Sequence, residues 1–359
     1  MKVAIVLGTR PEIIKMAPVI RECQKRQVEH FVLHTGQHYS YSMDKVFFDD
    51  LELDGADHNL EVCSGSHAVQ TGKILAGAEK VFMEERPDVI LVQGDTNTVM
   101  AAALAATKLG IKVGHVEAGL RSFDRSMPEE INRVIADHIS NYLFAPTEAS
   151  RRYLADEGIV NGVHVTGNTI VDSVFQAREI AARRSDVLDK LGLSPSNYIL
   201  ATAHRAENVD VRNRLEGMLK GIASVSKELG LEVIFPMHPR TQGRMREFGI
   251  DAGPVRVIDP VGFLDFLQLE SNARLVLTDS GGVQEETCIL NVPCVTLRDN
   301  TERPETVEVG SNMLAGTDPN KILTAAREMF IRSRDWSNPF GDGHASRRIM
   351  DILFDDIRQ

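Results

Sequence analysis

The fold is decided near the start of the chain, where the apolar run VAIVL (residues 3–7) is followed by GTRPE (residues 8–12). An unbroken apolar run of this length is typical of a strand that is buried on both faces of a parallel sheet. Pro11 suits the first turn of a helix, because its missing N–H would have no partner there. The stretch therefore predicts a buried strand that leads through a glycine loop into a helix over residues 11–25.

The same alternation continues along the first half of the chain and then starts again. In the first half, strands are predicted at residues 31–34, 89–93, 113–116 and 142–144, and helices at 69–85, 98–109 and 129–140. After Gly167-Asn168, strands are predicted at 198–202, 233–235, 256–258, 274–278 and 294–297, and helices near 213–229, 241–248, 263–270 and 283–290. A turn-rich bend at 336–343 precedes a last amphipathic helix at 345–357. Two successive β–α series predict an α/β protein with two Rossmann-like, doubly wound parallel sheets.

Charge and composition exclude several classes of partner. The 359 residues carry 40 Lys and Arg against 51 Asp and Glu, a formal charge of −11, which argues against nucleic acid or an anionic membrane as a partner. A local basic pocket for a small anion stays open. No apolar stretch approaches the roughly 20 residues that span a bilayer, and the N-terminus does not resemble a signal peptide, so we expect a cytoplasmic protein. The four cysteines form no CxxC pair, and no His and carboxylate spacing suggests a metal, so we expect neither a metal nor a cofactor.

The strongest phosphate signal is Ser280-Gly281-Gly282, between a predicted strand and a predicted helix. Glycines allow the backbone to approach a ligand closely, and the free N–H groups and dipole of a helix N-terminus favour an anion. The alternative is a tight turn capped by Ser280. Because parallel strands end at one edge of a sheet, Arg10, His204 and Arg205 are expected to face the ligand from other strand ends. Lys15, one helical turn beyond the first glycine loop, points back toward the same region.

Two nucleotide motifs are missing. No G-x-G-x-x-G follows a strand, so a dinucleotide fingerprint is absent. Thr71-Gly72-Lys73 is similar to the end of a P-loop, but position 67 is His67 instead of glycine and the segment lies in a predicted helix. We therefore do not expect a dinucleotide cofactor or ATP hydrolysis.

Three acidic residues, Asp95, Glu117 and Glu129, lie at or just beyond two strand ends of the first half. Asp95 alone is explained as a helix cap, and Glu129 alone as a complement to a helix N-terminus. Three converging carboxylates are harder to explain in this way, because their repulsion costs stability while it raises their pKa values and suits acid–base work. The residues thus predict two domains facing a cleft, with a diphosphate anchor in one and carboxylates in the other, which fits a nucleotide-sugar enzyme.

Several motifs together carry a resemblance to a known family, and they lie at residues 8–12, 93–96, 115–121, 128–133, 202–208, 278–286 and 302–305. In these motifs the chain resembles the non-hydrolysing UDP-N-acetylglucosamine 2-epimerases. The resemblance implies the glycosyltransferase-B fold, a homodimer, and a final helix that returns to the first domain. We accordingly expect residues 1–168 with helix 345–359 to form the domain that acts on the sugar, and residues 169–344 the domain that binds UDP.

The resemblance also implies the reaction and the residue roles. UDP-N-acetylglucosamine and UDP-N-acetylmannosamine would interconvert by elimination of UDP to 2-acetamidoglucal and its re-addition. By matching motif positions, Asp95, Glu117 and Glu129 are the proton-transfer candidates, and His204 assists the departure of UDP. Arg10 and Lys15 would bind diphosphate and sugar. The remaining nucleotide contacts implied are Ser280, Gly281 and Gly282 at phosphate, Glu286 at the ribose, Phe266 at the uracil, and Arg303.

One segment departs from the family pattern. Many bacterial members carry Gln-His-Arg-x-Met, which binds a second UDP-N-acetylglucosamine as activator, whereas residues 37–43 read QHYSYSM and lack the Arg. We expect this protein either to lack the activator requirement or to meet it differently.

Three alternative functions remain: a glycosyltransferase of the same fold, a hydrolysing epimerase and a non-catalytic nucleotide-sugar sensor. The three carboxylates argue against the sensor.

Overall fold

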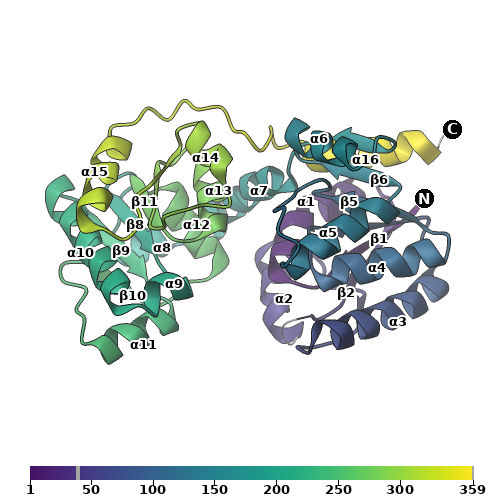
Figure 1. Cartoon of the computed structure of the whole chain (residues 1–359), viewed down its shortest axis with the longest axis horizontal. Coiled ribbons are helices and arrows are strands. Elements are labelled where there is room, and N and C mark those ends of the chain that lie inside the picture. Colours follow the sequence, from purple (N-terminus) through teal and green to yellow (C-terminus); the bar gives the residue numbers. More distant parts are fainter. Residues whose placement is uncertain (38–40, 358–359) are drawn as a thin grey trace. The chain divides into compact units, whose positions relative to one another are not determined.

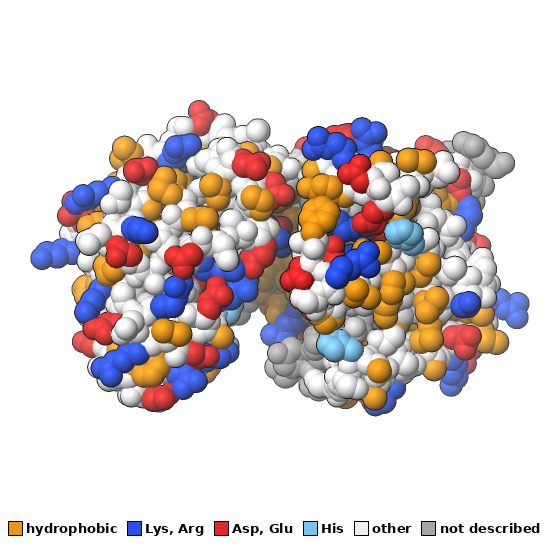
Figure 2. All heavy atoms as spheres, in the orientation of Figure 1, with side chains coloured by type: hydrophobic (Ala, Val, Ile, Leu, Met, Phe, Trp, Pro, Cys, Tyr) orange, Lys and Arg blue, Asp and Glu red, His pale blue; other side chains and the backbone are white. Residues whose placement is uncertain are grey.

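The protein consists of two compact units, each built on its own parallel sheet. The computed structural model describes residues 1–37 and 41–357. The first unit comprises Met1–Gln176 and Phe340–Gln359, and the second comprises Ala177–Pro339 (Figure 1). The chain therefore passes between the units inside α7 (Thr169–Arg184), whereas the sequence places the boundary at residues 168 and 169. In Figure 2, basic and acidic side chains are interspersed over the visible face of each unit.

The first unit holds a seven-stranded parallel sheet. Its order is β3-β2-β1-β4-β5-β6-β7, so β1 and β4 are central and the chain reverses direction across the sheet between them. The strands are β1 (Lys2–Leu7), β2 (Glu29–His34), β3 (His58–Asn59), β4 (Val89–Gln93), β5 (Lys112–Val116), β6 (Tyr142–Ala145) and β7 (Val163–Val165). Ligands bind beyond the carboxyl ends of strands at such a switch point.

Helices cover both faces of this sheet. They are α1 (Arg10–Lys25), α2 (Tyr41–Asp50), α3 (His67–Glu85), α4 (Asn97–Lys108), α5 (Pro128–Ile139), α6 (Glu148–Asp156), the start of α7, and α16 (Ala345–Ile357). The apolar faces of α3, α4 and α5 bury Ala4, Val6 and Ile90 together with other alternate strand positions. α16 packs against α1, where Arg26 forms a 2.8 Å ion pair with Asp351 and lies over the ring of Phe354.

The second unit holds a six-stranded parallel sheet with the order β10-β9-β8-β11-β12-β13. Its strands are β8 (Tyr198–Thr202), β9 (Glu232–Pro236), β10 (Arg256–Ile258), β11 (Leu275–Thr278), β12 (Cys294–Thr296) and β13 (Asn312–Leu314). Its helices, after the end of α7, are α8 (Val187–Leu191), α9 (Ala206–Val209), α10 (Arg212–Leu229), α11 (Pro239–Phe248), α12 (Phe263–Ser271), α13 (Gly281–Ile289), α14 (Pro304–Glu308) and α15 (Pro319–Phe330).

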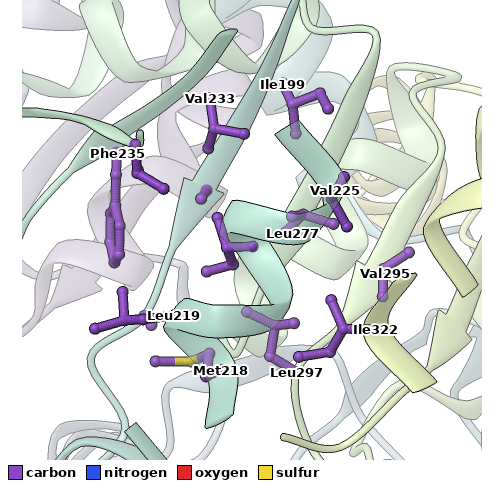
Figure 3. Close-up of a cluster of buried hydrophobic side chains, with 14 of the residues drawn as sticks. Ile199, Met218, Leu219, Val225, Val233, Phe235, Leu277, Val295, Leu297 and Ile322 are labelled. Atoms are coloured by element: carbon purple, nitrogen blue, oxygen red, sulfur yellow. The ribbon is translucent and has the colours of Figure 1, made fainter. Parts of the chain in front are cut away.

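One face of the second sheet packs on α10 and α15. Figure 3 shows Met218, Leu219 and Val225 of α10 beside Val233, Phe235 and Leu277 of the strands. Ile322 of α15 joins the same buried cluster. These side chains are fully or almost fully buried. Each Å² of apolar surface removed from water contributes ~25 cal/mol to the free energy of folding, so the burial of this cluster is the main source of stability of the unit.

The strands and helices predicted from both series are present, with ends that differ by a few residues. Three short edge strands, β3, β7 and β13, and several helices, including α7 and α15, were not predicted. These three strands have only two or three residues and carry too little apolar pattern to be recognised, whereas β10, an edge strand of three residues, was predicted. The two-sheet α/β prediction is confirmed.

Candidate active site

The first unit places Glu117 at the end of β5 and surrounds its carboxylate with donors. Oε1 lies 2.6 Å from Lys15 Nζ and accepts a 2.9 Å hydrogen bond from Asn168 Nδ2, while Oε2 accepts one from Gln93 Nε2. The side chain is 6% exposed. Glu117 also has φ 70°, a left-handed backbone that is unusual for a residue with a side chain and that recurs at functional sites.

The Asp95 carboxyl is influenced by the charges of both Glu117 and Glu129. Asp95 follows β4 and forms an ion pair with Arg133 of α5, and Glu129 is half-buried in the first turn of α5. Burial raises the pKa of the Asp95 carboxyl above its ordinary value, Arg133 opposes this, and the negative charge of Glu117 and, more weakly, that of Glu129 add to it. The structure thus brings the three predicted carboxylates together with Lys15 at one edge of the first sheet.

The turn between β1 and α1 is held by Glu12. Its Oε2 accepts hydrogen bonds from the N–H groups of Gly8 (2.6 Å) and Thr9 (2.7 Å), and Oε1 accepts one from Thr96 Oγ1 (2.6 Å). Burial raises the pKa of Glu12 to about 7, although these hydrogen bonds oppose it. Arg10 starts α1 and lies over the ring of Phe47, 5.2 Å from its centroid.

In the second unit, Ser280 precedes α13, and its N–H donates to Thr278 Oγ1 at 3.0 Å. A Cβ added to Gly281 would meet its nearest atoms, Glu302 Oε2 and Arg205 Nη2, at 3.5 and 3.8 Å, and one added to Gly282 would meet nothing closer than 3.9 Å. Packing within the unit therefore does not require glycine at either position. Gly281 is buried and Gly282 is exposed, so the missing side chains allow an anion to approach the N-terminus of α13 at Gly282.

His204 and Arg205 follow β8 and are positioned by Asp279 at the end of β11. The Asp279 carboxylate, which is fully buried, accepts hydrogen bonds from the N–H groups of His204 (3.0 Å) and Arg205 (3.0 Å) and from Asn208 Nδ2 (3.2 Å). The side chains of His204 and Arg205 stay 45% and 38% exposed. Burial lowers the pKa of His204, so its imidazole is neutral near pH 7.

The other three predicted nucleotide contacts also lie in the second unit. Phe266 is half-buried on α12, and Glu286 is half-buried on α13. Arg303 precedes α14, and its Nε lies 2.7 Å from Oε1 of Glu285, a neighbour of Glu286 on the same helix. Arg303 is thus held beside α13.

The residues that hold these groups in place were not predicted from the sequence. Arg133 pairs with Asp95, Asn168 binds Glu117, and Asp137 of α5 binds His115 and Arg121. No sequence pattern identifies them, because the face of α5 that becomes buried is rich in polar residues, which an amphipathic pattern assigns to solvent.

Two further expectations concern ligands. Among residues 1–37 and 41–357, no group of three or more His, Cys, Asp and Glu could hold a metal ion. Of the segment compared with the activator motif, residues 38–40 lie outside the described residues. Gln37 is buried, and its Oε1 accepts hydrogen bonds from the N–H and hydroxyl of Thr98.

Comparison with known proteins identifies the family. The model of the UDP-N-acetylglucosamine 2-epimerase family matches residues 21–354. A UDP-N-acetylglucosamine 2-epimerase of Methanococcus maripaludis is 53% identical over 361 residues, 98% of each chain. A UDP-2,3-diacetamido-2,3-dideoxy-D-glucuronate 2-epimerase of Pseudomonas aeruginosa is 39% identical over 363 residues, 98% of this chain and 99% of the relative.

Solved structures agree. The chain is similar to the UDP-GlcNAc 2-epimerase of Methanocaldococcus jannaschii, with 52% identity, 99% of both chains covered and a TM-score of 0.91. A structure of that enzyme in complex with UDP-GlcNAc and UDP has 53% identity, the same coverage and a TM-score of 0.83. No helix among the described residues is long and apolar enough to cross a membrane. The chain belongs to the UDP-N-acetylglucosamine 2-epimerase family.

Proposed function

We propose that this protein interconverts UDP-N-acetylglucosamine and UDP-N-acetylmannosamine by inverting C2 of the sugar, without hydrolysis. The observation that carries the proposal is the convergence of Asp95, Glu117 and Glu129 with Lys15 at the strand ends of the first unit. The family and the substrate named for its relatives support the same reaction.

The reaction that suits these groups is an elimination followed by a re-addition. The C2 proton is not acidic in the intact sugar, so a base removes it as the C1–O bond breaks and UDP leaves with the bonding electrons. The product, 2-acetamidoglucal, has a double bond between C1 and C2. UDP then adds back to C1 while a proton arrives on the opposite face of C2, which inverts that centre. The raised pKa of the Asp95 carboxyl suits that group to proton transfer.

In this proposal the second unit binds UDP. The open N-terminus of α13 at Ser280, Gly281 and Gly282 donates backbone N–H groups to phosphate. His204 and Arg205 stabilise the charge on departing UDP. Glu286 accepts hydrogen bonds from the ribose hydroxyls, Phe266 lies at the uracil, and Arg303 completes the nucleotide contacts. Arg10 and Lys15 of the first unit bind diphosphate and sugar.

Proton NMR in D2O tests the proposal. Purified protein is incubated with UDP-N-acetylglucosamine, with no added cofactor, and the sugar signals are followed. We expect UDP-N-acetylmannosamine to appear with deuterium at C2, because the returning proton comes from solvent. A small amount of 2-acetamidoglucal with UDP would identify the intermediate.

Other outcomes assign other functions. Free N-acetylmannosamine with stoichiometric UDP would indicate a hydrolysing epimerase. An unchanged spectrum despite UDP binding would indicate a glycosyltransferase awaiting its acceptor, or a different sugar. The P. aeruginosa relative makes UDP-2,3-diacetamido-2,3-dideoxy-D-glucuronate the substrate to test next. Turnover of that compound alone would replace the proposed substrate while keeping C2 inversion.

A further inference from the structure

Glu117 stands on a backbone that needs support. Its φ of 70° lies in the left-handed region, where a residue with a side chain is strained and persists only if its surroundings hold it. The carboxylate contacts to Lys15, Gln93 and Asn168 fix the end of the side chain. They do not fix the backbone conformation.

Asp137 of α5 contacts residues on both sides of Glu117. Its Oδ1 lies 2.7 Å from Nδ1 of His115, two residues before Glu117, and its Oδ2 accepts a 3.1 Å hydrogen bond from the N–H of Gly119, two residues after. Oδ2 also lies 2.7 Å from Nη1 of Arg121. One buried carboxylate therefore ties the strand before the strained residue and the turn after it to a single helix.

His115 extends this support to the neighbouring strand. Its Nε2 lies 2.8 Å from the carbonyl oxygen of Gly94, the residue before Asp95. A carboxylate and a carbonyl oxygen can only accept, so both ring nitrogens must donate, and His115 is an imidazolium. Its side chain and that of Asp137 are fully buried.

The charges around this imidazolium favour it. Burial lowers the pKa of His115, but Asp137, the Gly94 carbonyl and Glu117 outweigh burial, and the pKa is raised. Arg121 carries the compensating positive charge on the other side of Asp137 and binds Glu157 through two nitrogens, at 2.7 and 2.8 Å. His115, Asp137 and Arg121 thus form a row of alternating charges with buried side chains, and the row ends at the exposed Glu157.

We propose that Asp137 and protonated His115 are a positioning pair for the proton-transfer carboxylates. Asp137 holds the strained segment that carries Glu117, and His115 holds the Gly94 carbonyl and so the turn that presents Asp95. Neither residue touches the substrate. The inference rests on the proposed function, because it concerns the placement of the groups that exchange the C2 proton.

The test compares Asp137→Asn with a matched control, Asp172→Asn. Asp172 is also buried in the first unit, where it accepts hydrogen bonds from the N–H groups of Ala345 (3.1 Å) and Ser346 (2.9 Å) at the start of α16. We expect kcat for C2 deuterium incorporation to fall on the order of 100-fold in Asp137→Asn, because small misplacements of catalytic groups have effects of this size. UDP affinity should stay within about twofold. Asp172→Asn should lower the melting temperature while kcat is retained.

A pH profile separates positioning from general damage to the fold. Because Asp137 raises the pKa of His115, its loss should move the alkaline limb of kcat to lower pH, and NMR of labelled histidine should show the same shift for His115. The groups that face His115 are Asp137, Glu117 and, through Asp137, Arg121, so the shift is read in Asp137→Asn with Glu117 and Arg121 intact. If Asp137→Asn and Asp172→Asn lost kcat to the same extent, and by the same factor at every pH, the inference would be overturned.

The variant His115→Gln and the wild-type protein provide two further comparisons. If Asp137→Asn does not fold, His115→Gln provides the same comparison, because a neutral amide cannot donate to Asp137 and Gly94 with the geometry of an imidazolium. Wild-type kcat in either variant would overturn the inference. If the wild-type protein itself incorporates no deuterium at C2, the proposed function fails instead, so the two failures are distinct.

Discussion

The turns that follow β1 and β8 are both held by a buried carboxylate, but the carboxylate comes from a different part of the chain in each. Each turn follows a central strand and donates two successive backbone N–H groups to a buried carboxylate. In the first unit the acceptor is Glu12, three or four residues further along the same chain segment. In the second unit it is Asp279, which comes from the neighbouring strand β11.

The difference decides what each turn presents. Because Glu12 occupies the N-terminus of α1 itself, that helix end is already filled by a carboxylate. Asp279 lies behind the turn after β8, so the side chains of His204 and Arg205 and the N-terminus of α13 stay open. The first unit therefore presents carboxylates with their own cations, and the second presents sites for an anion.

The largest expected effect is that of Glu117→Gln. The variant loses the carboxylate that pairs with Lys15, so we expect kcat for C2 deuterium incorporation to fall by about 10³-fold, within the range for loss of a general acid or base. UDP affinity, measured by calorimetry, should change far less than kcat, because most of the proposed UDP contacts belong to the second unit and only Arg10 and Lys15 come from the first. Glu148→Gln, which changes an exposed side chain at the start of α6, serves as the control and should have wild-type kcat.

A loss of UDP affinity as large as the loss of kcat would contradict the division of roles between the units. It would mean that Glu117 and Lys15 act mainly in binding UDP. Retention of kcat would remove Glu117 from the proton transfer.

Glu12→Gln tests the turn after β1, which is held by a carboxylate of the same segment, through the pH dependence of stability. Burial raises the pKa of Glu12 from 4.5 to about 7, so the folded state binds a proton that the unfolded chain has released between these values. The free energy of unfolding of the wild type should then fall as pH rises through this window, by at most about 3 kcal/mol. Gln keeps one acceptor for Gly8 and Thr9 and a donor for Thr96. Urea unfolding between pH 4.5 and 7 should show a flatter profile for the variant, and parallel profiles would refute the shift.

Asp279→Asn tests the turn after β8, which is held by a carboxylate at the end of β11. The amide offers one acceptor and directs its N–H₂ group at a backbone donor, so we expect a loss of about 2 kcal/mol in the free energy of unfolding of the second unit. The turn that carries His204 and Arg205 should also lose its order, and UDP affinity should fall. Urea unfolding and calorimetry measure the two effects. Weakened UDP binding with unchanged stability would show that Asp279 acts on the ligand and not on the turn.

The same comparison shows how far the sequence predicts the molecule. Thr9-Arg10-Pro11-Glu12 has the spacing of a local capping motif, and Ser280-Gly281-Gly282 lies between a predicted strand and helix, so both positions could be recognised in the chain. The partners Asp279 and Asp137 could not, because their contacts join segments that only the sheet order brings together. A polar residue in a helix is assigned to solvent by pattern, and only the fold reveals that Asp137 is buried.

The smallest expected effect is that of Gly281→Ala, read against Gly8→Ala. A Cβ at Gly281 finds its nearest neighbour at 3.5 Å, so stability should be unchanged, while the methyl group covers the N-terminus of α13 and weakens UDP binding by about tenfold, or 1.4 kcal/mol. A Cβ at Gly8 would lie 2.1 Å from Thr98 Oγ1, so that variant should instead lose stability. Calorimetry with UDP and thermal unfolding separate the two. If Gly281→Ala binds UDP as tightly as the wild type, the open helix end is not the phosphate site, and the contrast with the filled end of α1 has no bearing on binding.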